Sequence, residues 1–215
     1  MPFKENYRAF IFDLDDTIVS SERLNVELIQ ALFAENWGIE IDKSDKDYIF
    51  GHSCEAIYGR LIEKYELDTS IDIMVSEEML AKQKWLSNHK LETARGIEDV
   101  LKLSGEKVIV SGSSGPVIQM SLDNVGLTDY FSSFFSSDDY ENGKPAPDGF
   151  QLAIDYLAVP TESILAFEDS PSGIRAAKAA GLDCVFIRQF AAEEASELAD
   201  AAFEDFEAFY QDYKK

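Results

Sequence analysis

Acidic side chains follow two apolar runs of the sequence, where they could bind a ligand or a metal ion. Asp13 and Asp15 stand at the end of the run RAFIFDL. In α/β sheets the carboxyl ends of the strands line the ligand crevice, so both are candidates for function. Glu168 and Asp169 follow the run ILAF, and acids in that position suit Mg²⁺, which prefers one or two carboxylates with waters and phosphate oxygens. The alternative for both segments is a polar N-terminal cap of the next helix.

Two further segments could bind a phosphate group. The segment SGSSG, residues 111–115, follows the run KVIV, and its small residues would expose backbone N–H groups that suit an oxyanion. Lys144 lies in the segment GKPAPD, where two prolines restrict the backbone and the lysine offers a compact positive charge. The alternatives are a flexible loop with a serine cap and a lysine in a solvated turn.

The elements that must position these residues show in the apolar periodicity. Four short apolar runs predict buried strands of a parallel sheet, at residues 8–14, 107–110, 164–167 and 184–187. Helical stretches separate the last three runs. Strands that alternate with helices predict a doubly wound α/β fold.

The region between the first two predicted strands has only helical periodicity. Leu24, Leu28 and Leu32, for example, fall four apart on one face. We therefore expect an all-helical domain of residues 18–92, inserted into an α/β core of residues 1–17 and 93–215. The acidic, aromatic tail after residue 190 predicts a final helix.

Composition limits the partners and the compartment. The 215 residues are 46% hydrophobic, enough for a core, but 41 acidic against 19 basic side chains give a formal net charge of -22. Such a surface disfavours nucleic acid and anionic lipid as partners. The two cysteines suggest no disulfide framework. No apolar run approaches the ~20 residues of a membrane span, and the first ten residues lack a secretory signal, so we expect a cytoplasmic protein.

The four polar segments, taken in order, resemble the motifs of a known superfamily. DLDDT, SGSSG, GKPAPD and EDSPSG are similar to the motifs of the haloacid dehalogenase-like (HAD) superfamily, specifically its phosphatase and β-phosphoglucomutase-like branch. The resemblance spans essentially the whole chain, and in the inserted domain it is architectural. It implies a Rossmann-like core with a helical cap domain after the first strand.

The resemblance implies a role for each candidate residue. Asp13 is the expected nucleophile, which forms an aspartyl-phosphate. Asp15 is the expected general acid and base, which protonates the leaving alkoxide and then activates water. Ser111, the Gly112 N–H and Lys144 are expected to bind the transferring phosphoryl group. Phosphoryl transfer needs mainly positioning and charge neutralisation, which fits this set.

The same resemblance implies a Mg²⁺ site. Its expected ligands are Asp13, the backbone carbonyl of Asp15 and Asp169, with Glu168 helping through water. Attack by a carboxylate on a phosphate dianion is repulsive without a cation. Mg²⁺ and Lys144 would supply the local positive charge that the acidic surface lacks.

Departures from the family pattern refine the prediction. Dehalogenases of the superfamily lack an acid at the second position, because an alkyl halide leaves without protonation, so Asp15 favours an oxygen leaving group. Asp16 stands where this branch often has glycine, and Ser20 replaces a common aspartate. Other phosphatases of the superfamily carry an acid at the position of Asp16.

The inserted domain bears on the choice between phosphatase and mutase. Residues 50–55, FGHSCE, resemble the substrate-specificity loop of the branch. β-Phosphoglucomutases place basic residues near the positions of Phe50 and Cys54, because a mutase must hold the second phosphate of a bisphosphate intermediate. Their absence favours hydrolysis. His52 is the residue expected to face the substrate, with a surface histidine at a helix start as the alternative.

We therefore predict a Mg²⁺-dependent phosphomonoesterase that acts on a small phosphate ester, with sugar phosphates as the favoured class. A hexose-phosphate mutase of the β-phosphoglucomutase type is the alternative enzyme. A non-catalytic protein that keeps the fold is the alternative from another class, although all four segments retain residues suited to chemistry. The sequence predicts no nucleic-acid or membrane partner and assigns no oligomeric state.

Overall fold

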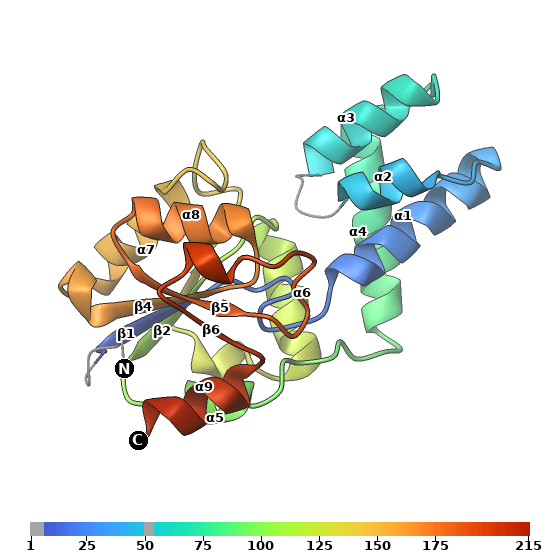
Figure 1. Ribbon diagram of the computed structural model, residues 1–215. Coiled ribbons are helices and arrows are strands. Elements are labelled where there is room, and N and C mark those ends of the chain that lie inside the picture. The colour runs from blue at the N-terminus through green and yellow to red at the C-terminus, as the bar shows by residue number, and fades with distance from the viewer. Residues whose placement is uncertain (1–6, 50–53) are drawn as a thin grey trace. The chain divides into compact units, whose positions relative to one another are not determined.

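The computed structural model describes residues 7–49 and 54–215 (Figure 1). Its strands in these ranges are β1 (Ala9–Phe12), β2 (Glu106–Val110), β3 (Ser133–Phe135), β4 (Ile164–Glu168), β5 (Asp183–Ile187) and β6 (Ala201–Phe203). The helices there are α1 (Glu22–Trp37), α2 (Lys43–Ile49), α3 (Cys54–Lys64), α4 (Ile71–Leu86), α5 (Ile97–Leu101), α6 (Gly115–Val125), α7 (Asp148–Leu157), α8 (Pro171–Ala179) and α9 (Phe206–Tyr213). All neighbouring strands pair in parallel, in the order β3-β2-β1-β4-β5-β6, which confirms the predicted doubly wound α/β fold.

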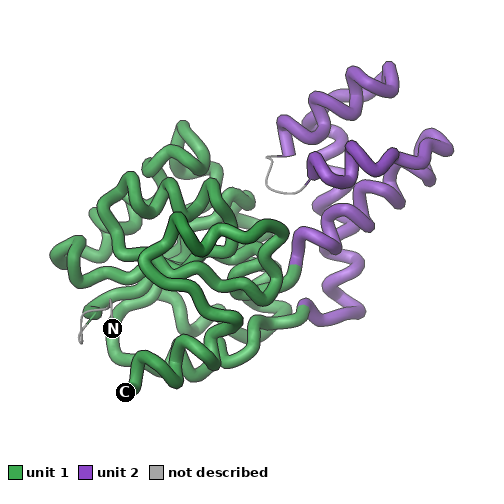
Figure 2. The backbone as a smooth tube through the Cα atoms, viewed as in Figure 1, with its two compact units in different colours: residues 1–20, 92–215 green, residues 21–91 purple. Residues whose placement is uncertain are grey.

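The chain divides into two compact units (Figure 2). The sheet unit consists of residues 1–20 and 92–215, and the helical unit consists of residues 21–91. The described residues of the helical unit form α1 to α4 and no strand, as the periodicity predicted. None of the described helices is long and apolar enough to cross a membrane.

Helices cover both faces of the sheet, and successive side chains of β1 pack alternately into the apolar layers on its two sides. Ala9 and Ile11 pack in one cluster with Phe150 of α7 and Ile174 of α8. Phe12 points to the other face, where its ring centroid lies 6.0 Å from that of Phe206 at the start of α9. Figure 1 shows α7 and α8 on one side of the sheet and α5 and α9 on the other. A strand buried on both faces must be apolar throughout, as the AFIF of β1 is.

The two strands that the sequence did not predict are β3 and β6. Each has three residues, all half-buried, and each lies at one edge of the sheet. So short an edge strand has no alternation to detect. The predicted final helix is confirmed as α9, which buries Phe206 and Phe209.

The buried face of α1 differs from the predicted one. The helix buries Leu24, Ile29 and Phe33, whereas Leu28 and Leu32 are half-buried beside this face. Ile29 and Phe33 belong to the apolar cluster of the helical unit. The four-residue spacing of leucines therefore identified residues at the border of the buried face of α1, not the residues at its centre.

Candidate active site

Three neighbouring strands deliver the predicted site residues to one edge of the sheet. β2, β1 and β4 are adjacent, and their carboxyl ends lead into Ser111, Asp13 and Glu168. The Asp13 N–H donates a hydrogen bond to the Phe167 carbonyl, at 3.0 Å, and so ties the end of β1 to β4. Parallel strands with these ends side by side form the crevice in which α/β proteins bind ligands.

Lys144 reaches this edge from the loop before α7. Its Nζ lies 2.5 Å from Asp13 Oδ1 and 2.6 Å from Glu168 Oε1, and it donates to the Val110 carbonyl at 3.2 Å. The Lys144 side chain is only 14% exposed. This lysine therefore does not occupy a solvated turn, which was the alternative interpretation of the sequence.

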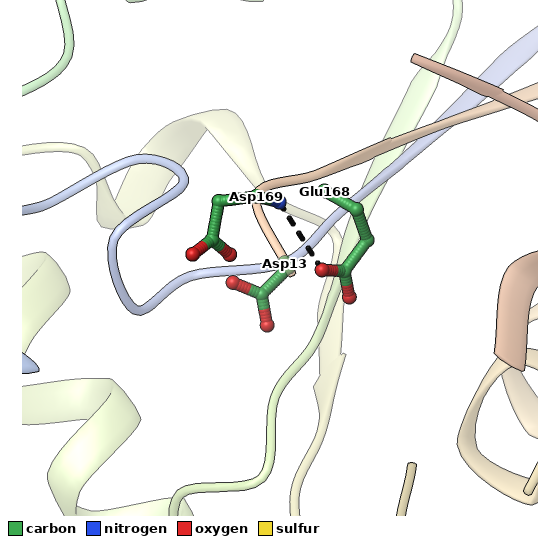
Figure 3. Close-up of side chains that lie close together, drawn as sticks. All are labelled: Asp13, Glu168 and Asp169. Atoms are coloured by element: carbon green, nitrogen blue, oxygen red, sulfur yellow. Dashed lines mark hydrogen bonds between the residues drawn. The ribbon is translucent and has the colours of Figure 1, made fainter. Parts of the chain in front are cut away.

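Three carboxylates surround a common point beside Lys144. Asp13 comes from the end of β1, and Glu168 and Asp169 come from the end of β4 (Figure 3). Each offers one carboxylate oxygen, and these three oxygens lie within 4.8 Å of one another. Thr17 Oγ1 donates to Asp169 Oδ1 at 2.9 Å and orients that carboxylate. Asp13 Oδ2 is buried and has no hydrogen-bond partner.

The negatively charged groups of this cluster outnumber its positively charged group. Burial raises the pKa of Asp13 to about 7 against the attraction of Lys144, and burial also raises the pKa of Asp169. Burial alone would lower the pKa of Lys144, but the charges of Asp13 and Glu168 raise it overall. Three buried carboxylates thus face one ammonium group, and a buried carboxylate oxygen is left without a donor. Oxygen ligands with excess negative charge fit a hard divalent cation.

Glu168 rests on the first turn of α8. Its Oε2 accepts hydrogen bonds from the Asp169 N–H at 3.2 Å, drawn as the dashed line in Figure 3, and from Ser170 Oγ at 3.1 Å. A Cβ atom on Gly173 would overlap the Glu168 carboxylate. The N-cap of α8 is Ser170, whose side chain accepts from the Gly173 N–H. Helix capping therefore does not account for the two acids of EDSPSG.

A turn after β1 gives Asp15 different partners from Asp13. The Ile18 and Val19 N–H groups both donate to the Leu14 carbonyl, so the strand does not continue. The Asp15 carboxylate is half-buried, and its Oδ2 accepts from Ser111 Oγ at 2.9 Å and from Ser113 Oγ at 2.8 Å. It does not belong to the group of three close carboxylates.

Asp16 has a backbone conformation that explains the family preference at this position. Its φ is 57°, in the left-handed region that glycine adopts freely, and its N–H donates to the Val19 carbonyl at 2.7 Å. Aspartate is one of the few other residues found there. The departure from glycine is therefore compatible with the turn.

The other predicted residues belong to the candidate phosphate-binding segment after β2 and to the helical unit. Ser111 is buried at the end of β2. Gly112 is exposed, and a Cβ on it would meet nothing within 4 Å, so its surroundings are open to a ligand. The N-cap of α6 is Ser114, but its side chain makes no cap hydrogen bond. His52 lies outside the described residues.

Three polar contacts of the site had no detectable signal in the sequence. Thr17 pairs with Asp169 from 152 positions away. The Tyr140 hydroxyl donates to the Ser111 carbonyl at 2.8 Å, and Ser113 pairs with Asp15 across 98 positions. Gly173 could have been identified, because a glycine in the first turn of a strong helix usually has a packing reason.

Comparisons with known proteins agree with this geometry. The family model described as haloacid dehalogenase-like hydrolase matches residues 10–187. The chain is 27% identical over 186 residues to the fructose-1-phosphate phosphatase YqaB of Escherichia coli, covering 86% of this chain and 98% of that protein. It is 27% identical over 182 residues to the phosphorylated carbohydrates phosphatase of Thermotoga maritima, covering 83% of each. The crystal structure of CbbY from Rhodobacter sphaeroides in complex with phosphate matches with a TM-score of 0.83 and 22% identity, over 93% of this chain and 95% of that one.

Proposed function

Because this chain belongs to the haloacid dehalogenase-like hydrolase family and is a phosphatase within it, we propose that it hydrolyses a small phosphorylated metabolite, with sugar phosphates as the substrate class. The observation that carries this proposal is the cluster of Asp13, Lys144, Glu168 and Asp169 at the carboxyl edge of the sheet, with Asp15 held beside it. The sugar-phosphate class is supported by the relatives that act on fructose 1-phosphate and on phosphorylated carbohydrates.

In the proposed reaction Asp13 attacks the phosphorus atom of the ester. A bond forms between an Asp13 carboxylate oxygen and phosphorus, the bond from phosphorus to the ester oxygen breaks, and Asp15 gives that oxygen a proton. Asp15 then accepts a proton from the water that attacks phosphorus in the aspartyl-phosphate. This second step releases phosphate and restores the Asp13 carboxylate.

The other residues bind and orient the phosphoryl group. Lys144, with its Nζ 2.5 Å from Asp13 Oδ1, offsets the repulsion between that carboxylate and a phosphate dianion. Ser111 and the Gly112 N–H donate hydrogen bonds to phosphoryl oxygens. Proton transfer and charge neutralisation are thus assigned to different residues.

The residues present fit a Mg²⁺ ion. Asp13, Asp169 and the Asp15 backbone carbonyl would hold it, with Glu168 acting through water, and the unpaired Asp13 Oδ2 is suited to ligation. When bound, Mg²⁺ would neutralise charge on the phosphoryl oxygens and on the three carboxylates.

The test is a screen of phosphorylated metabolites with the purified protein, following phosphate release. We expect release from one or more sugar phosphates in the presence of Mg²⁺, loss of activity in EDTA, recovery with Mg²⁺, and poor replacement by Ca²⁺, which favours more ligands and longer bonds. Release that continues unchanged in excess chelator would contradict the metal assignment. A complete absence of release across the panel would contradict the substrate class.

A second arm separates hydrolysis from a mutase reaction. We propose that the helical unit, residues 21–91, acts as the substrate-specificity cap and that His52 faces the substrate. Without basic residues at Phe50 and Cys54, we expect free phosphate from α- and β-glucose 1-phosphate, with no stimulation by a sugar bisphosphate. Rapid formation of glucose 6-phosphate with little free phosphate would establish the mutase instead.

A further inference from the structure

We propose that Ser113 is a positioning residue that holds the carboxyl group of Asp15 for proton transfer, an assignment that rests on the proposed function. Ser113 Oγ donates to Asp15 Oδ2 at 2.8 Å, across 98 positions of sequence. Ser111 Oγ donates to the same oxygen at 2.9 Å. Two hydroxyl groups of the loop after β2 therefore fix the end of a side chain from the loop after β1.

The two serines cannot both keep this contact during the reaction. A serine hydroxyl has one proton and donates one strong hydrogen bond at a time. If Ser111 donates to a phosphoryl oxygen, as its proposed role requires, its bond to Asp15 must be given up. Of these two hydroxyls, Ser113 is then the one that still holds Asp15 Oδ2.

Ser113 is itself fixed on both sides of its side chain. Its N–H donates to Ser111 Oγ at 3.0 Å, and its carbonyl accepts from the Ser137 N–H at 3.1 Å. The Tyr140 hydroxyl holds the neighbouring Ser111 carbonyl at 2.8 Å. The hydroxyl of Ser113 thus projects from a backbone that is hydrogen-bonded to the segment after β3, as an effective positioning group requires.

The proposed reaction requires the held Asp15 carboxyl group to give a proton to the leaving oxygen. That proton moves to the leaving oxygen as its bond to phosphorus breaks and the bond from Asp13 forms. Ser113 acts only through Asp15, so its contribution must follow the need of the leaving group for a proton.

The experiment compares kcat/KM for esters with different leaving groups. This constant reports the transfer to Asp13 and excludes the later hydrolysis step. For Ser113→Ala we expect kcat/KM to fall about 10- to 100-fold with an alkyl ester such as glycerol 2-phosphate, whose alkoxide needs the proton. With p-nitrophenyl phosphate the fall should be less than about 3-fold. The loss on the alkyl ester is then a part of the ~10²–10⁴-fold that a general acid typically contributes. Asp15→Asn should show the same order of effects with larger losses.

Two variants complete the design. Ser113→Thr keeps the hydroxyl and should recover most of the activity on the alkyl ester. Ser163→Ala is the control, because Ser163 precedes the amino end of β4 and its hydroxyl donates to the Pro160 carbonyl at 2.6 Å, so both substrates should be hydrolysed as by wild type. Circular dichroism checks that each variant is folded.

The outcomes distinguish this proposal from the proposed function. Equal losses on both esters, or no loss, in folded Ser113→Ala would overturn the role of Ser113 while the phosphatase stands. If Asp15→Asn also lacks a leaving-group dependence, the general-acid role of Asp15 fails and takes the Ser113 proposal with it. The proposed function itself is overturned only if the wild-type protein also releases no phosphate from any sugar phosphate of the panel.

Discussion

Two buried aspartates, one in each unit, have opposite electrostatic environments. In the sheet unit, Asp13 is 5% exposed and shares a single cation, Lys144, with Glu168. One of its oxygens lacks a hydrogen bond, and burial raises its pKa to about 7.

In the helical unit, Asp45 of α2 is fully buried but has matched partners. Lys64 Nζ lies 2.6 Å from its Oδ2, and the Tyr65 hydroxyl donates to the same oxygen at 2.7 Å. Its Oδ1, like Asp13 Oδ2, has no hydrogen bond, but a second cation, Arg60, pairs with it, with Nε at 3.4 Å. Burial acts to raise the pKa of Asp45, but the hydrogen bonds from Lys64 and Tyr65 outweigh it and lower the pKa.

The difference indicates how to separate a structural charge cluster from a functional one. Carboxylates that are matched by cations fix the geometry of a fold, whereas carboxylates in excess over the cations destabilise it. Proteins that keep such an excess do so at sites that bind a ligand. By this criterion Asp45 stabilises the packing of α2 against α3, and Asp13 is available for a cation and a phosphate.

The largest expected effect is the loss of activity in Asp13→Asn. The substitution keeps the shape but removes the attacking charge and a metal ligand, so we expect turnover to fall at least ~10³-fold. The free energy of unfolding should not decrease, because one of the excess charges is gone. Steady-state kinetics and urea denaturation of the same preparation measure both quantities. Near-normal turnover of Asp13→Asn, or a marked fall in its free energy of unfolding, would contradict the distinction between a functional Asp13 and a structural Asp45.

Mg²⁺ should stabilise the folded wild-type protein. A ligand that binds only the folded state adds about 2.7 kcal/mol at 100 times its Kd, and we expect a corresponding rise in Tm. In Asp169→Asn, which lacks one of the three carboxylates, the rise should be much smaller. The Asp45→Asn protein is the matched control and should respond like wild type. An equal response of Asp169→Asn would place the ion elsewhere.

Gly173→Ala should impair the site without unfolding the protein. The added Cβ would displace the Glu168 carboxylate from the start of α8, and with it the contact to Lys144. A misplacement of about 1 Å can cost ~10²-fold, so we expect turnover to fall about 10- to 100-fold. The matched control is Gly59→Ala in α3, where the new Cβ would lie 3.8 Å from Ile71 Cδ1 and turnover should not change. Full activity of Gly173→Ala would show that the position of Glu168 is not needed.

The contrast between the units also shows what sequence reasoning could reach. Asp13, Lys144 and Glu168 carry local signals, since two of them end apolar runs and one lies between glycine and proline. The parallel order of the strands then brings them together. The pairing of Asp45 with Lys64 has no such signal, because the two residues lie on different helices and only the tertiary packing joins them.

Helix α4 shows a related limit. Its buried residues are Met74, Glu78 and Lys82. A prediction from hydrophobic residues alone would place the charged Glu78 and Lys82 on the solvent-exposed face of the helix. Glu78 accepts from the Tyr58 hydroxyl at 2.6 Å, and Lys82 donates to Asn25 at 3.0 Å. These partners come from α3 and α1, and no spacing along α4 predicts them.

The smallest of the expected effects concerns stability in Asp45→Asn. The change leaves Lys64 and Arg60 without their buried partner, although both can still reach water. We expect the free energy of unfolding to fall by about 1–3 kcal/mol, measured by urea denaturation at pH 7. The matched comparison is Asp13→Asn under the same conditions. A similar loss in both variants would contradict the comparison.

The pH dependence of this loss distinguishes a charge effect from a packing effect. Because the pKa of Asp45 is lower in the folded than in the unfolded protein, its ionised form stabilises the fold above the unfolded pKa of about 3.9. That contribution disappears as the pH falls through the folded-state pKa. The difference in unfolding free energy between wild type and Asp45→Asn should thus stay constant from about pH 8 to about pH 5 and shrink below about pH 4. If the difference does not shrink at all as the pH falls below about 4, the amide disturbs packing and the ion pairs of Asp45 contribute nothing measurable.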